Sequence, residues 1–174
     1  TVNHDEVGIS AVLKDLEGFI AHVADRIRGL TGKVQIAVEE WGEDHAALVD
    51  HYLKVRTLAP GTRHIFGRVG DYVRKSPDAV LFAARDAEGK LQAMAVGDYS
   101  AMKTAFYMFA FRRDDCPPGV SDALVAALAR EAEKRGQSVL NLGLGIDGGI
   151  SFFKKKWEAY EAMPHLETSW AVQG

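Results

Sequence analysis

The sequence has little cysteine and no long apolar run, and each absence excludes a class of protein. Cys116 is the only cysteine among the 174 residues, so the chain has no internal disulfide framework and no cysteine-rich metal site. The six histidines are scattered without the spacing of a zinc motif, so we expect no metal ion. No apolar run reaches the ~18 residues of a membrane span, and no signal-peptide pattern is present. The cytoplasm is therefore the expected location.

An excess of charge of either sign is also missing. The chain has 21 Lys and Arg residues and 24 Asp and Glu residues, for a net charge of −3. No overall basic field therefore indicates a nucleic-acid-binding protein. Hydrophobic residues make up 47% of the chain, and its length is enough for one domain with a hydrophobic core. We find neither a linker nor an internal repeat, and expect one domain over 1–174. Its start at Thr1 fits a chain excised from a longer protein.

Hydrophobic periodicity predicts the elements of the first half. Apolar residues at three- and four-residue steps predict a helix over 6–30, so that 1–32 form an N-terminal helical extension. Alternating apolar residues predict a strand over 33–41. Helical spacing then returns in two segments, 43–59 and 64–76.

After residue 76 the spacing of the apolar residues changes from that of helices to that of strands. Three apolar or alternating runs joined by short turns indicate an antiparallel meander; they cover 79–86, 91–100 and 104–112. The elements after the meander are a helix at 119–136, a strand at 138–144, a short helix at 149–157 and a strand at 165–172. A meander followed by a crossover helix and another strand predicts a mixed sheet with helices on both faces.

A glycine motif follows the strand at 138–144. Gly143, Gly145 and Gly148 have the spacing Gly-x-Gly-x-x-Gly, which binds a dinucleotide when it follows the first strand of a parallel βα array. Here only about 25 residues follow it, and an antiparallel meander precedes it. We interpret these glycines as residues that permit a tight strand-to-helix transition, and expect no nicotinamide or flavin.

The order of elements resembles that of the GNAT acyltransferase superfamily over residues 79–172, and extends back to residue 33. In that family a loop of the type Arg/Gln-x-x-Gly-x-Gly/Ala follows the fourth strand, and its backbone N–H groups bind the pyrophosphate of coenzyme A. The matching stretch here is FRRDDCPPGVSDAL. The resemblance implies that the donor is bound at Phe111, Arg112, Arg113, Gly119, Val120 and Ser121.

The C-terminal part also resembles the Fem-type aminoacyltransferases and related lysyltransferase domains, which take an aminoacyl group from charged tRNA. Phe153 stands where ordinary GNAT enzymes have the tyrosine that protonates the leaving thiolate. In the Fem-type branch the lysine of a Phe-Lys pair lies near the donor phosphates. By that resemblance Asn141 and Lys154 are further donor-binding residues, and Gly143 is part of the same motif.

Amide formation from a thioester or an ester needs a deprotonated amine, a stabilised oxyanion and aligned reactants. In this fold the oxyanion donor is usually a backbone N–H of the fourth strand, here within Tyr107–Phe111. The candidate bases are polar residues on strands or at their ends: Asp98, Tyr99, Tyr107 and Glu40. Cys116 has no histidine near it in the sequence, so we do not expect it to be a nucleophile.

The sequence thus predicts a GNAT-like α/β (α+β) domain with a mixed, mainly antiparallel sheet. We expect an N-acyltransferase that moves an acyl group from acetyl-CoA or another acyl-CoA to the amine of a small molecule or peptide. Two alternatives stay open: a Fem-like transferase that uses aminoacyl-tRNA, and a non-catalytic GNAT-like module that binds a ligand. A splay between strands 104–112 and 138–144 would support insertion of an acyl donor.

Overall fold

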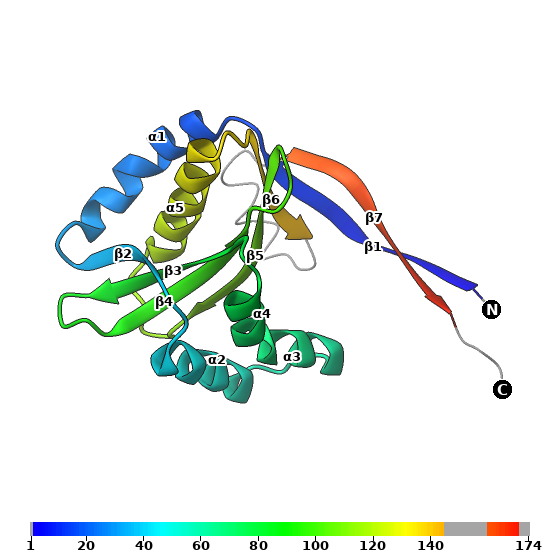
Figure 1. Cartoon of the computed structure of the whole chain (residues 1–174), viewed down its shortest axis with the longest axis horizontal. Coiled ribbons are helices and arrows are strands. Elements are labelled where there is room, and N and C mark those ends of the chain that lie inside the picture. Colours follow the sequence, from blue (N-terminus) through cyan, green and yellow to red (C-terminus); the bar gives the residue numbers. More distant parts are fainter. Residues whose placement is uncertain (1, 145–159, 171–174) are drawn as a thin grey trace.

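A seven-stranded sheet forms the centre of the computed structural model, which describes residues 2–144 and 160–170 (Figure 1). The strands lie in the order β2-β3-β4-β5-β6-β1-β7. Their bounds are β1 (Val2–Leu13), β2 (Val34–Glu39), β3 (Ala79–Asp86), β4 (Leu91–Asp98), β5 (Thr104–Arg112), β6 (Val139–Leu144) and β7 (Tyr160–Trp170). Neighbouring strands are antiparallel except β5 and β6, which are parallel. The predicted fold class is therefore confirmed.

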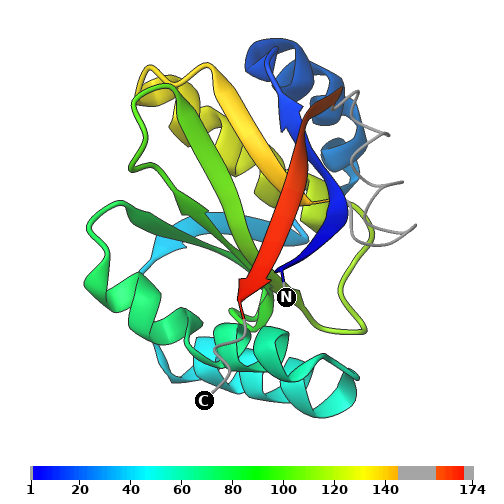
Figure 2. The same ribbon diagram turned by 90° about the vertical axis from the view of Figure 1, so that its right-hand side faces the viewer.

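Helices cover both faces of this sheet (Figures 1 and 2). Their bounds are α1 (Leu16–Ile27), the 3-10 turn η1 (Arg28–Leu30), α2 (Glu43–Val55), α3 (Pro60–Gly67), α4 (Val69–Lys75) and α5 (Val120–Lys134). The elements α1 and α5 pack against one face in one core cluster, and α2 and α4 pack against the other face in a second cluster. Among the described residues, no helix is both long enough and apolar enough to cross a membrane.

β4 is buried along nearly its whole length because helices lie on both of its faces. Ala93 and Ala95 point to the α1–α5 side, whereas Met94 and Val96 point to the α2–α4 side. This alternation follows from the two-residue period of a strand. The two small alanines allow the sheet to lie close to α5.

A β-bulge in β5 changes the face that its side chains occupy. Val96 pairs with Phe109, but the next residue of β4, Gly97, pairs with Tyr107, so Met108 is an extra residue in the ladder. Tyr107 consequently packs with the α1–α5 core and Phe109 with the α2–α4 core. Without the bulge, their two-residue spacing would place both side chains on one face.

The N-terminal segment differs from the prediction. Residues 2–13 form β1, which lies between β6 and β7, and the helix begins only at Leu16. The helix predicted over 6–30, and with it the helical extension over 1–32, is therefore wrong in its first half. The side chain of Asp15 marks the true start of α1, since it accepts a hydrogen bond of 2.8 Å from the N–H of Gly18.

Sequence alone does not decide between a strand and a helix for residues 2–13. Val7, Ile9, Ala11 and Leu13 recur at every second residue, as in a strand, while other apolar residues of the segment keep helical steps. The pairing with β6 and β7 decides in favour of the strand, and those partners lie at the far end of the chain.

The remaining predictions agree with the described elements, with small shifts. The helix predicted over 64–76 is two helices, α3 and α4, that meet at Arg68, and the last strand covers 160–170 rather than 165–172. The short helix predicted over 149–157 lies outside the described residues.

Candidate functional site

β5 and β6 pair at one end and then separate (Figure 2). The ladder runs from the pair Thr104–Val139 to the pair Phe106–Asn141. Beyond it, β5 continues to Arg112 without a β6 partner among the described residues, while β6 stays paired with β1. Within the part of the chain that the structure describes, the backbone N–H and C=O groups on the outer edge of β5 beyond Phe106 therefore have no strand partner, and we call this opening the gap.

A bend in β6 accompanies this separation. The Oδ1 atom of Asn141 accepts a hydrogen bond of 2.7 Å from the N–H of Gly143. Gly143 has a φ of +74°, a conformation that favours glycine because it has no Cβ. Asn141, which the resemblance assigns to donor binding, thus makes a local contact at the closed end of the gap.

A cavity of about 220 Å³ lies at the open part of β5. Its walls come from β4, β5, α2 and α5, and include Phe111 and Ala110. The polar residues that line it are Tyr52, Arg56, Tyr107, Arg112 and Ser121. The structure thus brings together Tyr107, Phe111, Arg112 and Ser121 of the predicted site.

The N-terminus of α5 lies at this cavity through Ser121. Gly119 is the N-cap residue, with a left-handed φ of +91°, and no side chain caps the helix. The first turn of a helix carries N–H groups without intrahelical acceptors and the positive end of the helix dipole. Val120 is buried, and its N–H lies 3.4 Å from the carbonyl oxygen of Pro117. Ser121 is therefore the residue that presents this helix end to the cavity.

The loop between β5 and α5 holds two carboxylates, each next to a cation. The Nε of Arg113 donates to Asp115 over 3.0 Å, and this hydrogen bond lowers the pKa of Asp115. Asp114 lies 3.6 Å from Nη2 of Arg56. Of the two neighbouring arginines, Arg113 is engaged by the loop, whereas Arg112 lines the cavity. Burial raises the pKa of the Cys116 thiol in the same loop, which disfavours the reactive thiolate.

Tyr107 and Asp98 lie on opposite sides of the sheet near the point of separation. Burial raises the pKa of Tyr107, so its hydroxyl stays protonated at neutral pH. Asp98 pairs with Phe106 across β4 and β5, in register with the last β5–β6 pair. Partial burial favours the neutral acid, but hydrogen bonds from Ser100 and Tyr72 outweigh it and lower the pKa of Asp98.

Two predicted candidates lie elsewhere. Tyr99 is buried in the α1–α5 core, where its hydroxyl donates to the carbonyl of Leu128 over 3.2 Å and the Arg135 guanidinium lies 4.6 Å from its ring centroid. Glu40 is exposed just beyond β2, which β3 and β4 separate from β5. Lys154 lies outside the described residues.

Residues of α2 and α4 join the site without having been predicted. Tyr52 meets Phe111 edge to face, with ring centroids 5.3 Å apart, and so brings Arg56 to the cavity. Tyr72 packs on Phe109 and bonds to Asp98. In the sequence these residues are ordinary members of amphipathic helices, and no local pattern marks them.

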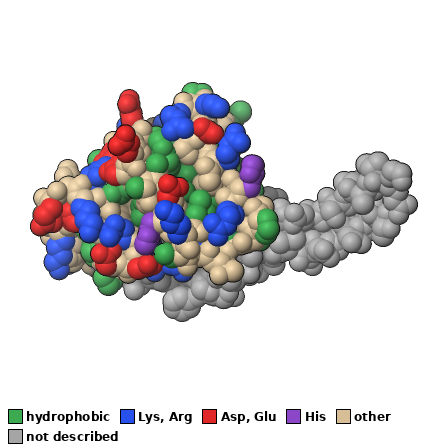
Figure 3. All heavy atoms as spheres, turned by 90° about the horizontal axis from the view of Figure 1, so that it is seen from below, with side chains coloured by type: hydrophobic (Ala, Val, Ile, Leu, Met, Phe, Trp, Pro, Cys, Tyr) green, Lys and Arg blue, Asp and Glu red, His purple; other side chains and the backbone are tan. Residues whose placement is uncertain are grey.

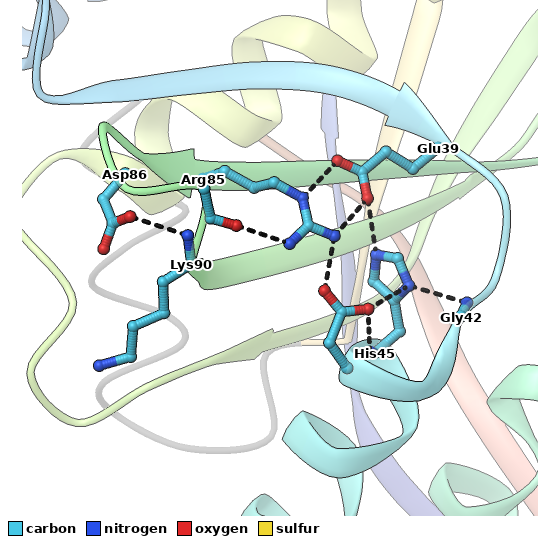
Figure 4. A network of polar contacts seen from close by, with 8 residues as sticks. Glu39, Gly42, His45, Arg85, Asp86 and Lys90 are labelled. Carbon is cyan, nitrogen blue, oxygen red and sulfur yellow. Dashed lines mark hydrogen bonds and ion pairs between the residues drawn. The ribbon is translucent and has the colours of Figure 1, made fainter.

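A second polar cluster lies at the opposite edge of the sheet, where α2 meets β2 and β3 (Figure 4). Arg85 donates two hydrogen bonds of 2.7 Å to Glu39, and lies 2.6 Å from Asp44. His45 is 1% exposed; its Nε2 lies 3.1 Å from Glu39 and its Nδ1 accepts the N–H of Gly42. Arg85 thus ties Asp44 of α2 to Glu39 of the sheet, whereas the buried Nε2 of His45 has no hydrogen-bond partner among the described residues. Within the described ranges, no three His, Cys, Asp or Glu residues form a possible metal site.

A mixed sheet that opens beyond its parallel pair, with a bulged strand and a helix N-terminus at the opening, defines a GNAT-like fold. No protein-family model matches the chain, and no curated protein matches it in sequence. Its likeness to known proteins therefore rests on solved structures.

Solved structures of two groups share this fold. L-PGS from Bacillus licheniformis matches with a TM-score of 0.65 and 14% identity, over 95% of this chain and 60% of that one. FemX matches with a TM-score of 0.62 and 9% identity, over 87% of this chain and 58% of the FemX chain. A ribosomal-protein-alanine N-acetyltransferase from Brucella melitensis biovar Abortus 2308 matches with a TM-score of 0.54 and 18% identity, over 81% of this chain and 99% of the acetyltransferase chain.

These matches confirm the resemblance to GNAT acetyltransferases and to Fem-type proteins, and at such identities they show the fold alone. The chain spans about 60% of the length of L-PGS and FemX.

Proposed function

We propose that the chain is an N-acyltransferase that holds an acyl donor along the free edge of β5 and passes the acyl group to an amine. The separation of β5 from β6 carries this proposal. An unpaired strand edge offers hydrogen bonds to the amides of an extended ligand, as it would to an added strand. The pantetheine arm of acyl-CoA has such amides and the length to follow the edge.

The charges around the cavity support a donor with phosphates. Arg56 and Arg112 are cations that line it, and Ser121 adds the positive end of α5. Arginine and a helix N-terminus are common partners of phosphate oxygens. We therefore assign the pyrophosphate of an acyl-CoA to this end of the gap.

The reaction then has a consistent set of groups. The amine nitrogen attacks the thioester carbonyl, a C–N bond forms, and the C–S bond breaks. Backbone N–H groups near the Met108 bulge face the developing oxyanion. Tyr107 is protonated at neutral pH and, because its raised pKa makes it a weak acid, serves as a relay: its hydroxyl proton passes to the leaving sulfur as it takes up the proton that the nitrogen loses when the amide forms. The low pKa of Asp98 makes it a weak base, so it attracts and orients the ammonium, which loses its first proton to water before the nitrogen attacks.

Aminoacyl-tRNA is the second candidate donor. L-PGS matches 95% of this chain, whereas the N-acetyltransferase matches 81%. The aminoacyl ester would occupy the same gap, and its nearest phosphates would meet the same cations. The groups that we assign to the transfer step would serve either donor.

Thermal unfolding with acetyl-CoA, and separately with charged tRNA, tests these donors. A ligand at 100 times its dissociation constant adds about 2.7 kcal/mol to the free energy of unfolding. We expect Arg112→Ala to reduce the stabilisation, and Arg113→Ala, whose side chain is paired with Asp115, to preserve it. Tyr107→Phe should lower kcat while donor binding persists. Stabilisation by tRNA alone would select the second donor, and stabilisation by neither would refute the proposal.

A further inference from the structure

A second hollow, of about 570 Å³, opens on the helical face opposite α1 and α5. It is lined by His64, Arg68, Asp71, Tyr72, Lys75 and Ser76 of α3, α4 and their flanking residues. Figure 3 shows the molecule from below, the side on which α2, α3 and α4 lie in Figure 1, with Lys, Arg and His side chains spread over the surface. The proposed function has not used this hollow.

The hollow has an excess of positive charge. Its one carboxylate, Asp71, is bonded to Arg74 over 2.9 Å and to Arg68 over 3.0 Å; these cations, Arg74 first, lower its pKa. The charge of Lys75, which also lines the hollow, likewise lowers the pKa of Asp71. The whole segment 51–76 has six Lys and Arg residues and one Asp, in a chain of net charge −3. A hollow of this kind attracts an anion.

Tyr72 connects the hollow to the point where β5 and β6 separate. Its ring lies against Phe109, with centroids 6.0 Å apart, just beyond the bulge of β5. Its hydroxyl donates to Asp98, which is in register with the last β5–β6 pair. Asp98 does not itself line the hollow, so Tyr72 lies between the cations of the hollow and this carboxylate.

We propose that this hollow binds the anionic group of the acceptor, which is thus a small amine that carries a phosphate or a carboxylate. The inference rests on the proposed function. Arg68 and Lys75 hold the anionic group, and Asp98 attracts the ammonium at the opposite side of Tyr72. The acceptor's two charges then match the two charged ends of the site, and its nitrogen is directed to the gap that holds the donor.

Binding without any donor provides the first test. Phosphoethanolamine and β-alanine carry a phosphate and a carboxylate on the same aminoethyl frame, and ethanolamine lacks the anion. We expect calorimetry to detect binding of phosphoethanolamine, of β-alanine or of both. Ethanolamine should bind at least tenfold more weakly than the better of these two anionic compounds. The better of the two anionic probes identifies the group. Equal affinity for all three compounds would overturn the inference.

Variants locate the binding. The double change Arg68→Gln and Lys75→Gln should weaken the better probe about tenfold, since it removes two exposed ionic contacts. Lys33→Gln is the matched control, because Lys33 is an exposed lysine before β2 and does not line the hollow. Asp71→Asn removes the competing carboxylate and should strengthen binding about threefold, a gain that a damaged fold cannot produce. If neither the Arg68→Gln, Lys75→Gln double change nor Asp71→Asn alters the affinity, the probe does not bind in this hollow.

Rates of acyl transfer to ethanolamine and to the two anionic amines distinguish a failure of this inference from a failure of the proposed function. Transfer to ethanolamine as fast as to the anionic amines would overturn the inference and leave the proposed function standing. Binding in the hollow without transfer from acetyl-CoA or from charged tRNA would refute the proposed function, and with it the assignment of the ligand as an acceptor.

Discussion

Blocking the open edge of β5 should abolish donor binding without disturbing either core. Ala110 lines the cavity of about 220 Å³ and is exposed, so the larger side chain of Ala110→Trp projects into the space assigned to the donor. Acetyl-CoA at 100 times its dissociation constant should stabilise the unchanged protein by about 2.7 kcal/mol. For a domain of this size, roughly 2–4 °C per kcal/mol converts this to a rise in Tm of about 5–11 °C. The variant should lose nearly all of that rise.

Differential scanning fluorimetry with and without acetyl-CoA measures both quantities. In the absence of ligand, Ala110→Trp should unfold within a few degrees of the unchanged protein, because surface substitutions usually alter stability little. Ala37→Trp is the control, since Ala37 is also an exposed alanine in a strand but lies on β2, away from the cavity. Full stabilisation of Ala110→Trp by acetyl-CoA would refute the placement of the donor along β5.

Two further predictions concern stability. A Cβ on Gly70 would lie 2.7 Å from the Trp41 ring, so Gly70→Ala should cost about 1–3 kcal/mol in chemical unfolding, whereas Gly61→Ala in open space on α3 should be neutral or stabilising. Hydrogen bonds from Arg85 lower the pKa of Glu39 in the folded protein. The ionised Glu39 carboxylate therefore adds to the free energy of unfolding above its unfolded-state pKa of about 4.3, and this stabilisation is lost as the pH falls through the pKa of the folded state. Glu39→Gln should lower stability at pH 7 by about 1.5–3 kcal/mol, the range for hydrogen bonds to charged groups, and flatten the fall of Tm between roughly pH 5 and 3; an unchanged acid slope would contradict the role of this pair.

The fold was predictable where local pattern and turn chemistry agree. The meander β3–β5 has apolar runs of strand length joined by short turns, and α5 has a helical period with Gly119 at its start. β1 was not predictable, because its apolar residues fit two periods and its partners are distant in sequence. The bulge at Met108 also left no local signal, since it depends on the register with β4.

The same distinction applies to the site. Arg112 and Ser121 belong to one continuous stretch around the β5–α5 loop, so a family motif could point to both of these cavity-lining residues. Arg56 and Tyr72 come from helices whose approach to β5 depends on tertiary packing. Tyr99 lies away from this cavity because a polar residue at a strand end can equally turn into the core, where its hydroxyl donates to the carbonyl of Leu128 in α5.

The position of β1 has a consequence for how the chain folds during synthesis. β1 is synthesised before both of its neighbours, β6 and β7, and Val2 pairs with Trp170, which lies far from it in the sequence. Until those strands are made, both of its edges carry unpaired backbone groups, which is the condition that favours aggregation. Contacts at such separation also form slowly. The β1–β7 ribbon should thus gain hydrogen-exchange protection last on refolding, after the β3–β5 meander.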